Sequence, residues 1–101
     1  EPRVLLLDEP TSSLDPRSQY EMMELVRSLA REKGFTALVV LHDLNLALCC
    51  CDRFLFLREG RAYCCGGPET VTGETIGAVY GIPAEVAQIG SRRVVVISPK
   101  R

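Results

Sequence analysis

Two short apolar runs without polar alternation dominate the first half of the chain. They lie within residues 3–7 and 35–41, and such runs predict parallel strands that are buried on both faces. Between them, Asp15 and Pro16 predict the start of a helix, as its N-cap and first helical residue. Apolar residues then recur at helical spacing as far as Gly34, which favours the helix end. This half therefore predicts a strand–helix–strand unit with parallel strands.

The second half predicts shorter elements separated by tight turns. In chain order we expect a short helix at 43–51, strands at 54–57 and 61–65, a short helix opened by Pro68, a helix from Gly73 to about Tyr80, and strands at 85–89 and 93–97. Turns at Glu59-Gly60 and Gly90-Ser91 would make each strand pair a hairpin. We expect the tail, 98–101, to be loose. Together the two halves predict an α/β fold with a mainly parallel sheet and antiparallel strands toward the C-terminus.

Composition narrows the classes of function. The chain has 101 residues, 47% of them hydrophobic, and a net charge of -1, so it is one domain or less and has no basic field for nucleic acid. Its apolar runs are too short to span a bilayer, so we expect contact with a membrane only through a partner. A buried central strand needs neighbours on both sides, and nothing precedes the strand at residue 3. We therefore expect a fragment of a longer domain, with exposed sheet edges, exposed apolar faces and a tendency to self-associate.

The five cysteines lie in two adjacent clusters, at 49–51 and 64–65. Neighbouring cysteines rarely bridge each other, and the chain carries no secretory signal that would place it in an oxidising compartment. A zinc site with His42 is a weak alternative, because paired ligands at short spacing are missing. We expect the cysteines to act as small buried hydrophobic residues.

Polar groups with reactive chemistry gather where the two apolar strands end. Asp8 and Glu9 follow the first strand, and His42 follows the second. Ligands of open α/β sheets bind outside the carboxyl ends of the strands. Neighbouring strand residues point to opposite faces, so the two acids can act at one site only if the strand has already ended there. Two carboxylates and an imidazole at one sheet edge suit metal-assisted hydrolysis of a phosphoryl compound.

These residues resemble a known family of ATPases. The stretch 4–15, with Leu-Asp-Glu-Pro followed by Ser-Leu-Asp, resembles the Walker B strand and D-loop of ABC-type ATPases. His42 resembles their switch histidine, and segments 57–61 and 66–69 resemble a hairpin and turn near the end of such domains. The resemblance runs from residue 3 to about residue 81. It implies the C-terminal half of the nucleotide-binding domain, part of a three-layer P-loop NTPase fold.

The resemblance also implies a role for each candidate residue. Asp8 would hold Mg²⁺ through water, Glu9 would polarise the attacking water, and His42 would contact the γ-phosphate of ATP. The loop that follows would cross to a second ATPase subunit and contact the nucleotide shared with it, through Ser12, Ser13 and Asp15. Asp15 can instead be only a helix cap, and the two roles are compatible. Asp43 is expected to cap its helix and not to act as a catalytic acid.

Three motifs of the family are absent from the sequence. It has no Gly-x-x-x-x-Gly-Lys-Ser/Thr loop, no glutamine loop and no Leu-Ser-Gly-Gly-Gln signature. We therefore expect the chain alone neither to bind ATP tightly nor to hydrolyse it. We assign residues 1–66 to the C-terminal part of the ATPase core, and residues 67–101 to a C-terminal helical segment with a terminal hairpin. Residues 85–101 resemble no segment of the family.

The family resemblance leaves the biological role open among several alternatives. Segments 42–47 and 73–82 look like ATPases of the importer group for iron-siderophore, haem and cobalamin, which work as homodimers bound to membrane permeases at the cytoplasmic face. Nothing in the sequence chooses among these cargoes. A non-transport ABC ATPase and a non-catalytic scaffold module are the rival hypotheses. Glu9 and His42 together argue against a scaffold, which would not need both.

Overall fold

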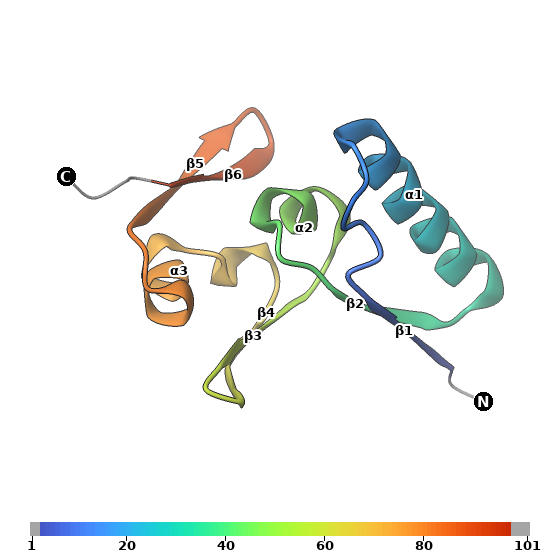
Figure 1. The fold of residues 1–101 in the computed structure, drawn as a ribbon, viewed down its shortest axis with the longest axis horizontal. Coiled ribbons are helices and arrows are strands. Elements are labelled where there is room, and N and C mark those ends of the chain that lie inside the picture. Colours follow the sequence, from blue (N-terminus) through green and yellow to red (C-terminus); the bar gives the residue numbers. More distant parts are fainter. Residues whose placement is uncertain (1–2, 98–101) are drawn as a thin grey trace. The chain divides into compact units, whose positions relative to one another are not determined.

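The computed structural model describes residues 3–97. The chain forms two compact units, Glu1–Cys50 and Cys51–Arg101. The elements, which can be followed in Figure 1, are β1 (Val4–Asp8), α1 (Pro16–Lys33), β2 (Thr36–Val40), α2 (Leu44–Cys50), β3 (Phe54–Arg58), β4 (Arg61–Gly66), the 3₁₀ helix η1 (Pro68–Thr70), α3 (Gly73–Tyr80), β5 (Ala84–Ile89) and β6 (Arg92–Ile97).

The first unit is a strand–helix–strand unit with a second, short helix. β1 and β2 pair in parallel, with Val4 opposite Thr36 and Asp8 opposite Val40. The helix α1 contacts β2 and α2, and it buries Met23 and Val26. Each strand has one half-buried set of side chains, at alternate positions. The predicted parallel pair and its connecting helix are confirmed.

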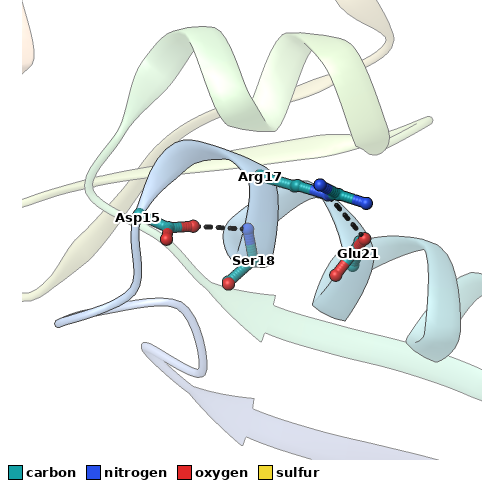
Figure 2. A network of polar contacts seen from close by, with 4 residues as sticks. All are labelled: Asp15, Arg17, Ser18 and Glu21. Carbon is teal, nitrogen blue, oxygen red and sulfur yellow. Dashed lines mark hydrogen bonds and ion pairs between the residues drawn. The ribbon is translucent and has the colours of Figure 1, made fainter.

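The ends of α1 follow the local signals in the sequence. Asp15 caps the N-terminus by accepting a hydrogen bond from the Ser18 amide at 2.8 Å, as Figure 2 shows. The same view shows Arg17 paired with Glu21 one turn further along, at 3.2 Å. At the C-terminus Gly34 adopts a left-handed φ of 71°, a conformation that costs glycine little because it has no Cβ. The predicted cap, first helical residue and stop are all confirmed.

The prediction that both strands are buried on two faces is wrong for the described residues. Val4 and Leu6 on β1 are 67% and 64% exposed, and Leu38 on β2 is 51% exposed. One face of the pair is partly buried, while the opposite face stays in solvent. An apolar run shows that its residues are hydrophobic, but it does not show whether other elements cover one face of the strand or both. The expected exposed apolar face is confirmed.

The second unit consists of two antiparallel hairpins, η1 and α3. β3 pairs with β4 and β5 pairs with β6. The turn between β3 and β4 places Glu59 and Gly60 at φ of 52° and 75°, the left-handed pair typical of a two-residue hairpin turn. The core of this unit is centred on Ile76 and Val71, at 0% and 1% exposure. Both predicted hairpins are confirmed.

Further predictions about the fold have different outcomes. The helix expected at 43–51 spans Leu44–Cys50, and Asp43 caps it as predicted by accepting from the amides of Asn45 and Leu46. Of the cysteines, Cys50 is buried and Cys65 is exposed, so the role of a buried hydrophobic residue is wrong for Cys65. The predicted division at residue 66 stays a prediction, and the loose tail falls outside the described residues.

Candidate functional site

The strand β1 ends one residue before Glu9. Glu9 has a φ of 51°, in the left-handed region that residues with a Cβ rarely adopt. Its amide donates to the carbonyl of Val40 at 2.9 Å, which fixes it beside the end of β2. Because the backbone has left the extended conformation, the alternation of strand faces no longer separates Asp8 from Glu9. The two acids could act at one site only if the strand ended before Glu9, and β1 ends at Asp8.

Glu9 and His42 meet at the carboxyl ends of the two parallel strands. The Nε2 atom of His42 lies 2.9 Å from Oε2 of Glu9, although the residues are 33 positions apart. The two side chains are 72% and 42% exposed, respectively, so the pair is open to solvent. The parallel register brings them together, since Asp8 and Val40 are paired and each reactive residue follows one of them. The predicted gathering of an acid and the imidazole at this edge is therefore observed.

The loop from Glu9 to Leu14 consists of two overlapping turns. The Ser12 amide and hydroxyl both donate to the Glu9 carbonyl at 3.3 Å. The Leu14 amide donates to the Thr11 carbonyl at 3.2 Å, and Thr11 itself is 5% exposed. Ser13 has a φ of 77°, the second left-handed residue of the loop. Hydrogen bonds within the loop thus hold two residues in a conformation that favours glycine.

An open depression of about 150 Å³ lies beside the Glu9–His42 pair. Its lining residues are Glu9, Thr11, Ser12 and Gln19 from one side of the chain, and Leu41, His42 and Asp43 from the other. Of the predicted site residues, the depression brings together Glu9, Ser12 and His42. Gln19 was not predicted as a site residue, and Asp43 was predicted only as a helix cap. Gln19 lies near the start of the helix that follows the loop, but the sequence does not indicate which group its side chain reaches.

Asp8, Ser13 and Asp15 do not line the depression. Asp8 is an exposed strand-end carboxylate. Asp15 is occupied by the amide of Ser18, and this backbone hydrogen bond is the main reason that the pKa of Asp15 is lowered, with the hydroxyl of Ser18 adding to it. Hydrogen bonds to the ionised form of a carboxyl favour that form. Asp15 is therefore a charged helix cap in this structure.

The described residues contain no cluster of three or more His, Cys, Asp or Glu side chains that could hold a metal ion. A single carboxylate such as that of Asp8, exposed at the end of β1, still fits Mg²⁺. This ion keeps several waters and is commonly shared between one or two carboxylates and phosphate oxygens of a substrate. The arrangement can thus orient water with a carboxylate, donate a hydrogen bond from an imidazole and contribute one ligand to a hydrated cation. Among residues 3–97 no helix is both long and apolar enough to cross a membrane.

The sequence of this chain is similar to parts of longer known proteins. It is 43% identical over 96 residues to an uncharacterized ABC transporter ATP-binding protein of Methanocaldococcus jannaschii, covering 95% of this chain and 38% of the relative. It is 51% identical over 81 residues to the hemin import ATP-binding protein HmuV of Pseudomonas aeruginosa, covering 79% of this chain and 31% of that protein. The HmuV protein of Vibrio cholerae is 43% identical over 98 residues, which are 96% of this chain and 38% of the relative.

Solved structures give the same result. An inward-facing conformation of a metal-chelate type ABC transporter matches with a TM-score of 0.75 and 26% identity, over 97% of this chain and 40% of the other. The cbiO1 protein of Clostridium perfringens, part of the ABC transporter complex cbiONQ, matches with a TM-score of 0.62 and 38% identity, over 67% of this chain and 27% of the other. The predicted fold class, a part of an ABC ATPase domain, is confirmed.

The chain matches only part of the length of each relative. The chain spans about a third of the length of the curated relatives that it matches, from 31% to 38% in the three cases above. No family model matches it. Because 96 of the 101 residues align with the archaeal relative, the similarity extends beyond residue 81 and includes most of 85–101. The expectation that this last segment resembles nothing in the family is therefore wrong.

Proposed function

Because the chain belongs to the family of ABC transporter ATP-binding proteins, we propose that it forms the C-terminal part of the subunit that hydrolyses ATP to drive an importer. The contact between Glu9 and His42 at 2.9 Å carries this proposal. It joins a carboxylate and an imidazole from two strand ends, with a depression of about 150 Å³ beside them. Both side chains are solvated, so neither is needed to fill a core.

Each residue at the edge has a role that its position supports. Glu9 accepts a hydrogen bond from the attacking water and polarises it. The ring of His42, 72% exposed at the side chain, donates a hydrogen bond to an oxygen of the transferred phosphoryl group. Positioning and charge stabilisation account for most of the catalysis of phosphoryl transfer, so few residues are required. Asp8 is the residue that would hold Mg²⁺, through water.

The loop after Glu9 supports a role at a subunit interface. Ser12, Ser13 and Asp15 lie on an exposed loop that leads into α1. In the proposal, this loop faces the nucleotide of a second copy of the ATPase subunit in a homodimer. Asp15 then has two functions, since it also caps α1. The further partners are membrane permease subunits, and the proposed location is the cytoplasmic face of the membrane.

The relatives favour a haem or metal-chelate cargo. Hemin import ATP-binding proteins are 43% to 51% identical to this chain, and a solved neighbour is a metal-chelate type transporter. We propose import of iron-siderophore, haem or cobalamin, with haem favoured by these names. Proteoliposomes that contain the complete transporter test this choice by uptake of haem, of cobalamin and of an iron-siderophore. Uptake of none of the three, with hydrolysis retained, would favour a non-transport ABC ATPase.

The decisive test uses the longer protein that carries these residues. Its Mg²⁺-dependent ATP hydrolysis is expected, and Glu9→Gln should abolish it, because the amide cannot accept a proton, while nucleotide binding is retained. Ser28→Ala on the exposed side of α1 is the control. Full activity of Glu9→Gln would refute the role of Glu9, whereas absence of hydrolysis in the longer wild-type protein would favour a scaffold role.

The 101-residue chain by itself is proposed to be inactive. It lacks the glycine-rich loop and lysine that would hold the phosphates. Isothermal titration with ATP and Mg²⁺ should show no tight binding, and purified chain should release no phosphate above background. Stoichiometric hydrolysis that depends on Glu9 would contradict this part of the proposal.

A further inference from the structure

One side chain from the helix α1 reaches back to the loop that carries the site. The Nε2 atom of Gln19 donates to the carbonyl of Thr11 at 3.4 Å, across eight positions of sequence. Gln19 is half-buried and Thr11 is 5% exposed, so this contact is partly shielded from water. It is weaker in geometry than the bonds within the loop. It is nevertheless a side-chain link between the loop and the rigid helix, distinct from the N-cap.

The position of Gln19 follows from helix geometry. Its amide bonds to the carbonyl of Asp15 at 2.8 Å, which places it one turn after the cap. Side chains of a helix lean toward its N-terminus. A long side chain at this position therefore lies over the preceding turn and extends to the loop. The same placement makes Gln19 part of the lining of the depression beside Glu9 and His42.

The loop needs such a restraint because of its backbone. Glu9 and Ser13 have φ of 51° and 77°, and neither is a glycine. Left-handed conformations are disfavoured for residues with a Cβ, so the isolated loop would relax toward other conformations. The Thr11 carbonyl lies between these two residues and accepts from both Leu14 and Gln19. Fixing that carbonyl restrains the loop at its centre.

We propose that Gln19 is a positioning residue, which holds the loop 9–14 in the conformation that keeps Glu9 and Ser12 facing His42. Gln19 touches no reacting atom in this scheme. It acts through Thr11 on the residues that do. The catalytic part of this inference rests on the proposed ATPase function, while the structural part can be measured without any nucleotide.

The experiment compares three substitutions. Gln19→Met keeps the length of the side chain and removes the donor, and Gln19→Lys restores a donor of similar reach. Gln88→Met is the matched control, because Gln88 also donates from its side-chain amide to a loop carbonyl, that of Gly90 at 3.2 Å, in the β5–β6 hairpin. Amide hydrogen exchange and the nuclear Overhauser contact between Glu9 and His42 are measured by NMR in the 101-residue chain. The kcat and KM for ATP are measured in the longer protein.

The proposal makes the following expectations. Gln19→Met should speed exchange of the Leu14 amide about fivefold, the effect of losing one net hydrogen bond, and should weaken the Glu9–His42 contact. In the longer protein it should lower kcat by a similar factor with KM unchanged. Gln19→Lys should recover part of both losses, and Gln88→Met should change neither.

Other results would overturn it. Wild-type values for Gln19→Met in both measurements would remove any positioning role. A failure of Gln19→Met to fold, or a loss that Gln19→Lys does not recover, would assign Gln19 to structure alone. If the longer wild-type protein hydrolyses no ATP, the proposed function fails, and the exchange and NMR contact still decide whether Gln19 positions the loop.

Discussion

The contact between Glu9 and His42 should contribute little to stability, although it is the central feature of the site. The proposed perturbation is a double-mutant cycle with Glu9→Gln, His42→Gln and both together. At the observed 2.9 Å, two full charges in water would attract by about 1.4 kcal/mol. The side chains are 42% and 72% exposed, so solvent screens the pair and the cost of ordering two side chains opposes it. We expect a coupling energy of about 0.2–1 kcal/mol.

The assay is urea denaturation of the 101-residue chain at pH 6, followed by far-ultraviolet circular dichroism, at low and at 1 M salt. The coupling should decrease at 1 M salt, where the screening length falls to about 3 Å. The chain offers a matched control in the exposed pair Arg17 and Glu21, at 3.2 Å and 89% and 62% exposure, for which about 0.3–0.5 kcal/mol is expected. A coupling above about 2 kcal/mol for Glu9 and His42, insensitive to salt, would refute the reasoning. The pair would then be a structural element and its presence would say little about catalysis.

Three other predictions concern the scaffold. The pKa of Asp15 is lowered in the folded chain, so its cap stabilises the fold fully above the pKa of an unfolded aspartate. This stabilisation is lost as the pH falls through the folded pKa. Acid denaturation of Asp15→Ala should therefore be less steep than that of wild type in the same circular dichroism assay. Ile76→Ala, at a position with 0% exposure, should lower the free energy of unfolding by about 2–5 kcal/mol in calorimetry, and a loss below 1 kcal/mol would show that the site collapses around the smaller side chain. Leu6→Lys, on the exposed face of β1, should reduce self-association in sedimentation velocity with little change in stability, and unchanged association would place the contact surface elsewhere.

Local signals in the sequence predicted most of the secondary structure. Asp15 with Pro16 set the start of α1, and Gly34 set its end, because capping depends on residues that are next to one another. The turn at Glu59-Gly60 likewise identified its hairpin. These elements needed no knowledge of the surrounding fold.

The site itself needed one rule beyond local pattern. Glu9 and His42 are 33 residues apart, and only the parallel pairing of two strands puts their carboxyl ends together. The left-handed backbone of Glu9 could not be predicted, since glutamate has no preference for it. Gln19 was missed because a glutamine in a helix carries no signal of which carbonyl it reaches.

Burial was the least predictable property. Val4 and Leu6 belong to a run of residues that usually lie inside a sheet, and the structure exposes both. Their chemistry is the same in either case. What differs is whether a second layer of structure covers the strand. That depends on the elements that pack against it and cannot be predicted from the residues of the strand alone.

The left-handed residues of the loop imply a conflict between thermal tolerance and catalysis. A glycine at position 9 or 13 would suit the backbone better than Glu9 or Ser13 does, with φ of 51° and 77°. Selection for heat resistance would therefore favour glycine at both positions, whereas the proposed role of Glu9 requires a carboxylate at position 9. If the proposed role of Glu9 is right, variants of this protein adapted to high temperature should keep the carboxylate at position 9 although its backbone is left-handed. The loop is then a place where a less stable backbone is retained for the sake of the group that it carries.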